Sequence, residues 1–392
     1  MIYRILFKLV IQRLDAESAH LLASRALRLV TAAPVVGALI ARFLAPGDDR
    51  LRVHALGQTF PSPLGVAAGF DKDATSFEGL GLLGFGFVEV GTVTALPQEG
   101  NPRPRVLRLP EERALLNAMG FPNPGAKATA ERLVRRTGRT VVGVNIGKSR
   151  VVDVAAAGAD YRDSVRALAP VAEYLVLNVS SPNTPGLRRL QSAELLGTLV
   201  TDVRAELESA QLETPILIKI APDLSDGEVD ALSNLALELG LDGIVAVNTT
   251  VERDGVPSLS AIGDPGDGGV SGAPLKGRAL EVLRRVRALV GDRMVLISVG
   301  GIENAADAWE RILAGATLVQ AYTGLVYGGP LWPRRVNAEL ARRVRAVGAS
   351  SIEELVGTAA QPARSPTSMS GLPNGGIGTS GVRTMAAAST TI

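Results

Sequence analysis

Eight short apolar runs, spread through residues 60–345, constrain the fold of this chain more than any other feature of its sequence. Most are rich in β-branched residues, and stretches that can form helices fit between most of them. The runs lie at residues 64–67, 87–90, 141–144, 174–177, 216–218, 244–247, 295–299 and 317–321. Apolar runs without polar alternation are typical of parallel strands buried on both faces. Helices are predicted at 126–136, 193–209, 226–239, 277–290 and 305–314.

Eight strand–helix repeats in roughly 290 residues predict a (β/α)8 TIM barrel, an α/β fold, because a doubly wound sheet more often has five or six strands. The active site of such a barrel lies where the strands end. The residues that close the runs form a polar ring that includes Lys72, Lys219, Asn145, Asn178 and Asn248.

The composition excludes several kinds of chemistry. The chain has no cysteine and only two histidines, His20 and His54, so disulfides, thiolate catalysis, iron–sulfur clusters and Cys/His zinc sites are ruled out. We expect no metal site. The net charge is only +2, which gives no reason to expect a nucleic-acid partner.

Residues 1–45 differ from the rest of the chain. Apolar residues recur at helical spacing over 2–14 and again over 18–44, where Pro34 interrupts the pattern, and six basic residues face two acidic ones. Two amphipathic helices are predicted, the second kinked or split. The longest uncharged stretch has 13 residues, at 29–41, whereas a membrane span needs about 20. The segment is therefore either a helical cap on the main domain or an interfacial membrane anchor.

A glycine motif and the C-terminal segment complete the predicted domain organisation. Gly79, Gly81 and Gly84 have the spacing of a dinucleotide-binding fingerprint, but they precede a strand instead of following one, so no Rossmann site is predicted. Residues 359–392 are rich in Ala, Ser, Thr, Gly and Pro and are predicted to be a disordered tail. The expected organisation is a helical segment at 1–45, a barrel at 46–358 and the tail at 359–392.

The densest polar stretch is the loop at residues 178–188, directly after the fourth predicted strand. Two prolines and a glycine predict a fixed backbone. The loop presents five amide and hydroxyl side chains within seven residues: Asn178, Ser180, Ser181, Asn183 and Thr184. This density, at the catalytic position of a barrel, favours a ligand over an ordinary turn.

Ten motifs of the sequence together resemble the class 2, quinone-dependent dihydroorotate dehydrogenases. The resemblance covers nearly all of residues 1–357, and its motifs lie at 67–73, 91–94, 97–105, 117–121, 143–148, 178–188, 219–223, 248–250, 298–301 and 319–329. It implies one flavin mononucleotide (FMN) per chain, oxidation of (S)-dihydroorotate to orotate in pyrimidine (UMP) biosynthesis, and reoxidation by a membrane quinone.

The resemblance also implies roles for individual residues. Ser181 matches the base that removes the substrate's C5 proton, which is a serine in class 2 and a cysteine in class 1. Thr184 matches the residue that relays the proton beside this base. Phe121 matches the side chain that shields the site from solvent, and Lys219 matches the lysine that stabilises negative charge on the reduced flavin.

Binding residues are implied in the same way. Substrate contacts match Lys72, Asn117, Ala118, Met119, Gly120, Phe121, Asn178, Asn183, Asn248 and Thr249. Flavin contacts match Ala68, Gly69, Lys72, Thr92, Asn145, Asn178, Lys219, Val247, Gly272, Gly300, Gly301, Tyr322 and Thr323. Quinone contacts match His20, Arg105 and Tyr322. The helices at 1–45 would form the quinone tunnel of a monomeric, peripheral protein on the cytoplasmic face of the cell membrane.

Two departures and two alternatives remain open at this point. Ala118 stands where the family usually has an arginine, and Val247 where a threonine is common. An aldolase that uses Lys219 or Lys72 as a Schiff base is an alternative enzyme. A peripheral membrane scaffold with a decayed site is an alternative without catalysis.

Overall fold

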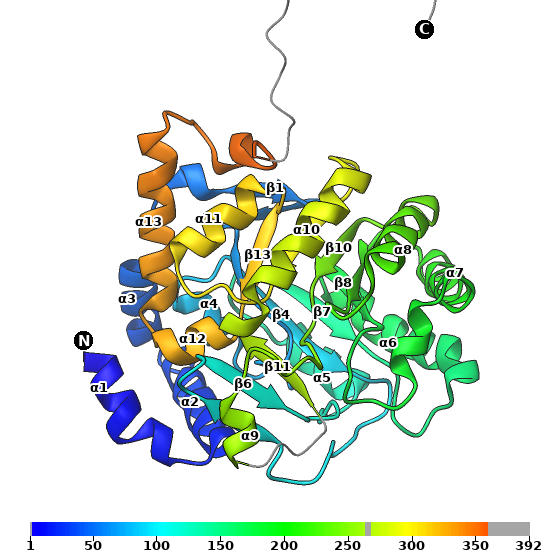
Figure 1. Cartoon of the computed structure of the whole chain (residues 1–392), viewed down its shortest axis with the longest axis horizontal. Coiled ribbons are helices and arrows are strands. Elements are labelled where there is room, and N and C mark those ends of the chain that lie inside the picture. The colour runs from blue at the N-terminus through cyan, green and yellow to red at the C-terminus, as the bar shows by residue number, and fades with distance from the viewer. Residues whose placement is uncertain (1, 263–267, 360–392) are drawn as a thin grey trace, which may run out of the picture. The chain divides into compact units, whose positions relative to one another are not determined.

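The computed structural model describes residues 2–262 and 268–359 (Figure 1). One compact unit spans Met1–Ala360. The predicted tail at 359–392 lies, apart from Ala359, outside the described residues.

Eight parallel strands close into a barrel, which confirms the (β/α)8 prediction. Around the barrel each strand pairs with its neighbours in chain order, as single right-handed crossovers require. The strands are β3 (Leu64–Val66), β4 (Phe87–Val93), β7 (Val141–Ile146), β8 (Tyr174–Asn178), β9 (Ile216–Ile220), β10 (Gly243–Ala246), β12 (Val295–Val299) and β13 (Leu318–Ala321). Each corresponds to one of the eight apolar runs.

Aromatic rings fill the barrel near the strand starts, and glycines make room for them. Phe87 packs edge-on against Phe60 with ring centroids 5.2 Å apart. Gly65 is the register partner of Phe87, and a Cβ at Gly65 would lie 2.4 Å from its ring. With this end filled, the space for a ligand lies at the opposite, C-terminal end of the strands.

Helices cover the outside of the barrel, and several begin where the sequence supplies a cap. Ser225 and Glu228 form a capping box at the start of one helix, and Asn304 with Asp307 forms one at another. The helices are α4 (Phe77–Leu82), α5 (Ala126–Val134), α6 (Ala157–Leu168), α7 (Ala193–Ser209), α8 (Asp226–Glu238), α10 (Lys276–Val290), α11 (Ala305–Leu313), α12 (Thr323–Gly328) and α13 (Trp332–Ala346). All five predicted helices are present.

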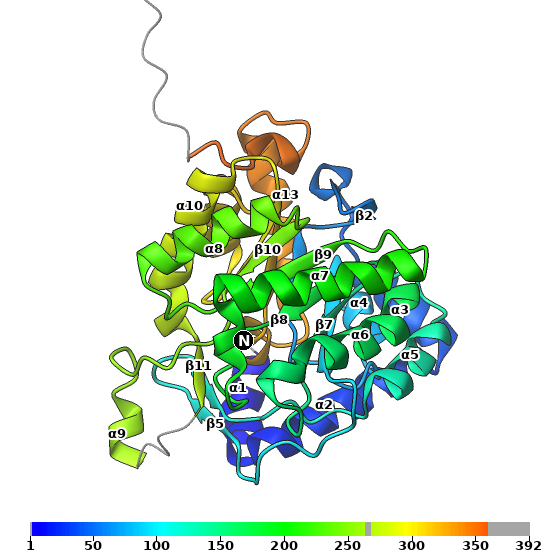
Figure 2. The same cartoon turned by 90° about the vertical axis from the view of Figure 1, so that its right-hand side faces the viewer.

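Two small antiparallel sheets were not predicted. One is the hairpin of β1 (Val53–Ala55) and β2 (Gln58–Phe60). The other has the strands β5 (Val106–Leu109), β6 (Ala114–Asn117) and β11 (Gly269–Gly272). Figures 1 and 2 show the three-stranded sheet and α9 (Ser258–Ile262) at the same end of the barrel as α1 and α2. These strands have only three or four residues, which leaves too little pattern for a sequence-based prediction.

The N-terminal segment forms α1 (Ile2–Leu9), a short 3-10 turn (Ile11–Arg13), α2 (Ala16–Thr31) and α3 (Pro34–Leu44). The predicted split occurs at Pro34, which is the first residue of α3 because proline has no N–H to continue a helix. Gly79 and Gly81 of the glycine motif lie in α4 and Gly84 lies just after it, and a Cβ at Gly79 would meet the Leu27 side chain of α2 at 2.8 Å. Gly79 therefore allows α2 to pack closely on α4.

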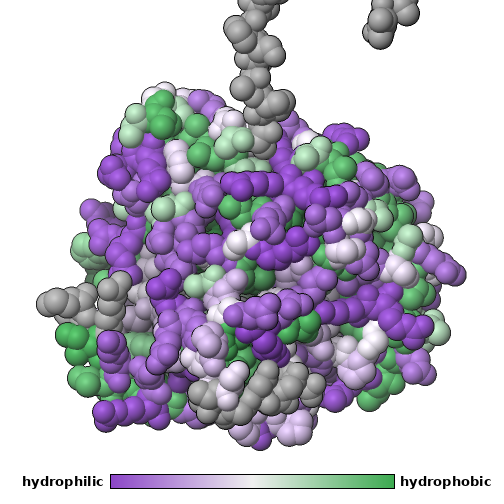
Figure 3. All heavy atoms as spheres, in the orientation of Figure 1, coloured by the Kyte–Doolittle hydropathy of each residue, from purple (hydrophilic) through white to green (hydrophobic). Residues whose placement is uncertain are grey.

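Large apolar side chains of this segment face solvent. They include Ile5, Leu6, Leu9, Val10, Leu14, Leu21, Leu22, Leu29, Val35, Val36, Leu39 and Phe43. Figure 3 shows hydrophobic side chains at the lower left of the molecule, where α1 and α2 lie in Figure 1. Among the described helices none alone is long and apolar enough to cross a membrane; α2 and α3 pass that test only together, and they are bent by 106°.

Candidate active site

A cavity of about 1330 Å³ opens at the C-terminal ends of the barrel strands. Its walls are the loops after the strands, the sheet strands β6 and β11, and helices α1 and α12. The predicted residues that line it are Ala68, Gly69, Lys72, Thr92, Asn117, Met119, Gly120, Phe121, Asn178, Ser181, Asn183, Lys219, Val247, Asn248, Thr249, Gly272, Gly300, Gly301, Tyr322 and Thr323. Predicted residues from seven of the eight barrel strand ends thus meet in one space, and β7 is the exception.

Five predicted residues do not line this cavity: Ala118, Asn145, Thr184, His20 and Arg105. Asn145 and Thr184 are buried next to residues that do line it. Ala118 lies beside the cavity residues Asn117 and Met119, and its carbonyl accepts a hydrogen bond of 2.8 Å from the Asn101 side chain. His20 and Arg105 lie toward the N-terminal helices.

The asparagines at the strand ends form one hydrogen-bonded network. Asn178 Nδ2 donates to Thr92 Oγ1 at 2.9 Å and to Asn145 Oδ1 at 3.1 Å. Asn248 Nδ2 donates to Asn178 Oδ1 at 3.3 Å and to Ser180 Oγ at 3.0 Å. Each amide is oriented by the next. Asn145 does not line the cavity, but it orients Asn178, which does.

Glu89 lies beneath this network in strand β4 and is fully buried. Its two carboxylate oxygens accept hydrogen bonds from Asn145 Nδ2 at 2.8 Å and from Gln320 Nε2 at 2.6 Å. The other end of the Gln320 amide, Oε1, is buried without a hydrogen-bond partner among the described residues. A buried carboxylate therefore lies inside the barrel, bonded to side chains of β7 and β13.

Lys219 brings a positive charge to the same region from strand β9. Its side chain is buried, with 5% of the residue exposed, and no hydrogen bond of its ammonium is found within residues 2–262 and 268–359. Burial lowers the pKa of Lys219, and the charge of Glu89 opposes that shift. The ammonium keeps its donors free for an electron-rich ligand atom in the cavity.

Lys72 is the second lysine of the cavity and follows strand β3. Its Nζ donates to the Gly69 carbonyl at 2.5 Å. Burial lowers the pKa of Lys72 to about 8, although Asp73 and Glu17 act in the opposite direction. At neutral pH the lysine is mostly protonated and can bind a carboxylate.

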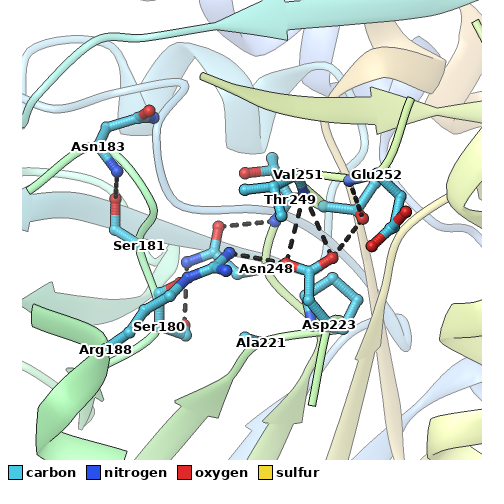
Figure 4. Close-up of polar contacts among 12 residues, drawn as sticks. Ser180, Ser181, Asn183, Arg188, Ala221, Asp223, Asn248, Thr249, Val251 and Glu252 are labelled. Carbon is cyan, nitrogen blue, oxygen red and sulfur yellow. Dashed lines mark hydrogen bonds and ion pairs between the residues drawn. The ribbon is translucent and has the colours of Figure 1, made fainter. Parts of the chain in front are cut away.

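The serine loop, residues 179–187, is drawn in Figure 4 with its neighbours. Ser181 lines the cavity, and its Oγ accepts a hydrogen bond of 3.2 Å from the Asn183 backbone N–H. Asn183 Nδ2 in turn donates to Asn117 Oδ1 at 3.2 Å. Thr184 Oγ1 is buried with no hydrogen-bond partner in the described part of the chain. A buried hydroxyl without a partner calls for a water or ligand atom to satisfy it.

Phe121 is held against the cavity by its own loop. The residue is 9% exposed and has a left-handed φ of 54°, while Asn123 Nδ2 donates to its carbonyl at 2.8 Å. A Cβ at Gly147 would lie 2.9 Å from the ring. Gln98 fixes the adjoining backbone by donating to the Gly120 carbonyl at 2.9 Å. The ring is thus a rigid part of the wall.

Glycines with positive φ shape another part of the cavity wall. Gly272, Gly300 and Gly301 have φ values of 104°, 109° and 74°, which L side chains rarely adopt. Arg311 is 1% exposed and donates to the Gly300 carbonyl at 3.0 Å from behind this wall. Ser271 and Thr323 hydroxyls bond to each other at 2.8 Å across it. Backbone N–H groups in such loops can approach the oxygens of a phosphate.

Glu17 joins helix α2 to this end of the barrel. Its carboxylate accepts hydrogen bonds of 2.8 and 3.1 Å from the Arg105 guanidinium and pairs with Arg103 at 3.0 Å. Burial acts to raise the pKa of Glu17, but the bonds and charges of the arginines outweigh it, and the pKa is lowered.

His20 is linked to the cavity through aromatic rings. Its ring packs on Phe70 with centroids 4.9 Å apart, and Phe70 packs on Tyr322 at 5.3 Å. Burial, together with the charge of Lys72, lowers the pKa of His20 to about 4. The imidazole is therefore neutral at physiological pH.

Comparison with known proteins identifies the family. The family model described as dihydroorotate dehydrogenase matches residues 50–344. The chain belongs to the dihydroorotate dehydrogenase family. Two curated relatives are both named dihydroorotate dehydrogenase (quinone). The Thermobifida fusca protein is 54% identical, and the match covers 94% of this chain and all of that protein. The Rhodococcus opacus protein is 55% identical, and the match covers 91% of this chain and 99% of that protein.

Solved structures of dihydroorotate dehydrogenase from Eimeria tenella agree with this assignment. The complex with ferulenol has a TM-score of 0.76 at 37% identity and covers 85% of this chain and 96% of its own. The ligand-free form has a TM-score of 0.75 at 38% identity and covers 83% of this chain and 97% of its own. The predicted class 2 membership is confirmed, and the chain is an oxidoreductase.

Four residues of this dihydroorotate dehydrogenase site were not predicted: Glu89, Gln320, Glu17 and Arg311. Glu89 and Gln320 did leave a signal, because each is a polar residue within an otherwise apolar strand run. Glu17 and Arg311 lie on helices among other charges, where an exposed side chain is the usual interpretation. Among the described residues there is no group of three or more His, Asp or Glu that could hold a metal.

Proposed function

We propose that this chain oxidises (S)-dihydroorotate to orotate in pyrimidine biosynthesis, with bound FMN and then a membrane quinone as electron acceptors. One observation carries the proposal: a serine in a fixed loop and a buried, unbonded ammonium face the same cavity at the end of a barrel. The names of the relatives support both the substrate and the quinone.

The residues of the cavity fit FMN. Lys219 has free donors, and the buried Gln320 Oε1 lacks a donor, so both can bond to the edge of a polar ring system. The glycine wall at Gly272, Gly300 and Gly301 suits the phosphate. Thr92 and Asn178 would contact the ring, and Asn145 would orient both of them through its Oδ1. Ala68, Gly69, Val247, Tyr322 and Thr323 would complete the site. FMN would supply the acceptor for the hydride that leaves C6 of the substrate.

Ser181 would take the proton from C5 of dihydroorotate. A serine is a weak base at its ordinary pKa, so its proton needs a path to solvent. The unpartnered Thr184 hydroxyl, three residues away, can hold the water that provides this path. Phe121 closes the wall and keeps other water from the reacting carbon.

The substrate is a carboxylate with a cyclic diamide, and the cavity offers matching groups. Lys72 carries the positive charge that a carboxylate needs. Asn117, Asn178, Asn183, Asn248 and Thr249 supply the donors and acceptors for the ring amides, with Met119 and Gly120 beside them. Ala118 replaces the family's usual arginine, so the charge that an arginine would bring to this segment is missing.

The N-terminal helices would bring the quinone from the membrane to the cavity. Their exposed apolar side chains and excess of basic residues fit a peripheral attachment to a lipid surface on the cytoplasmic face of the cell membrane. Tyr3, Phe7 and Tyr322 line the cavity on this side, and His20 and Arg105 lie behind them. We propose that the chain works as a monomer.

The visible spectrum of the purified protein tests the proposal. Anaerobic addition of dihydroorotate should bleach the flavin band. A band that stays unchanged contradicts the substrate, and a protein that binds no flavin contradicts the cofactor.

Ser181→Ala tests the base. We expect flavin content and orotate binding to be retained, while flavin reduction at neutral pH slows by about 10²- to 10⁴-fold, the usual contribution of a positioned base. Reduction at the wild-type rate would remove Ser181 from this role.

A further inference from the structure

Arg188 ends the motif that contains the serine loop, and nothing above gives it a role. It lies on the 3-10 turn Leu187–Gln191, and its Nε donates to the Ser180 carbonyl at 3.1 Å (Figure 4). Its Nη2 pairs with Asp223 Oδ2 at 2.8 Å. One guanidinium therefore holds the serine loop and a residue of the loop after β9.

Asp223 extends this link to the loop after β10. Its Oδ1 accepts hydrogen bonds from the Thr250 hydroxyl and from the Val251 N–H, the latter at 3.2 Å. The Asp223 side chain is only 11% exposed, and that of Arg188 29%. The pair thus joins the loops after β8, β9 and β10, two of which carry proposed substrate contacts.

The carbonyl that Arg188 holds is next to the reacting residue. The Ser180 carbonyl and the Ser181 N–H belong to one planar peptide group, so fixing the oxygen fixes the plane from which Ser181 extends. A guanidinium is planar and can donate from Nε and Nη in fixed directions. A lysine in its place has one nitrogen, which cannot occupy both positions.

We propose that Arg188 and Asp223 are positioning residues that orient the Ser180–Ser181 peptide so that the Ser181 hydroxyl meets C5 of the substrate. The inference rests on the proposed role of Ser181. A misplacement of about 1 Å in a reacting group can cost about 10²-fold in rate. The pair therefore acts on the proton-abstraction step, whereas flavin binding and the quinone reaction do not depend on it.

Arg188→Lys and Asp223→Asn test the proposal in the flavin-loaded full chain. Stopped-flow reduction by dihydroorotate should slow by about tenfold to a hundredfold in each. Orotate affinity, flavin content and reoxidation by quinone should stay within about threefold of wild type, since the amide oxygen introduced by Asp223→Asn can still accept from the Val251 N–H. The double variant Arg188→Lys, Asp223→Asn should be no slower than the slower single variant, because paired residues act as a unit.

Arg189→Lys is the matched control, because Arg189 is exposed on the same turn and its side chain has no hydrogen bond or ion pair among the described residues. Its reduction rate should equal that of wild type. Reduction of both test variants within twofold of wild type overturns the inference, as does a loss that parallels lost flavin or lost orotate affinity. Ser181→Ala, measured beside them, separates the two claims: a fast Ser181→Ala refutes the proposed base, whereas a slow Ser181→Ala with fast Arg188 and Asp223 variants refutes the inference alone.

Discussion

Orotate affinity should fall as pH rises above neutrality, because Lys72 loses its proton within that range. Burial lowers the pKa of Lys72 to about 8, so at pH 7 about nine-tenths of the lysines are charged, and at pH 8.5 about one quarter. Only the charged form attracts a carboxylate. If the neutral form does not bind, the apparent Kd scales with one plus the ratio of neutral to charged lysine, and it should rise about fourfold from pH 7 to 8.5.

The assay is a titration of the oxidised protein with orotate, followed by the change in flavin absorption. Binding of the product is measured instead of turnover, because turnover would also depend on the proton transfer proposed for Ser181. Lys72→Arg is the control, since a guanidinium stays charged throughout this range. Its affinity for orotate should be independent of pH, whatever its absolute value.

Two results would refute this reasoning. A wild-type Kd that is constant from pH 7 to 8.5 would mean that Lys72 remains charged or does not bind the carboxylate. A rise of the same size in Lys72→Arg would assign the pH dependence to another group.

Three further outcomes are expected. Gly79→Ala should reduce quinone-dependent turnover severalfold while flavin reduction by substrate is retained, because the new Cβ would press on Leu27 of α2; Gly197→Ala, where the space is open, is the control, and equal loss of both half-reactions would contradict the link to quinone. His20, with its pKa near 4, should give no step in quinone reoxidation between pH 5.5 and 7.5; a step that disappears in His20→Gln would refute the neutral imidazole. Phe87→Ala should lower the free energy of unfolding by about 3–5 kcal/mol in urea titrations, since the ring is fully buried. A loss below about 1 kcal/mol would show that the neighbouring side chains at the strand starts move in to fill the space of the ring.

The barrel and the edge that carries its site could be predicted from the sequence because both depend on local patterns. Each strand contains one mostly apolar run, and the alternation with helices leaves one common way to join parallel neighbours. Residues that close the runs must then meet at one end of the barrel. Ser181, Lys219 and Lys72 meet in the cavity for this reason.

The partners of those residues were decided by the tertiary structure alone. The charge of Glu89 raises the pKa of Lys219 from another strand, and Arg188 forms an ion pair with Asp223 on a different loop. No spacing along the chain relates these pairs, because their separation in space depends on how the barrel closes. The sheet of β5, β6 and β11 was missed for the same reason, since its strands become stable only where residues 106–117 meet residues 269–272. The sequence by itself determined which residues reach the site, and tertiary packing decided what holds them there, because charges and short strands take their stability from neighbours that are distant in the chain.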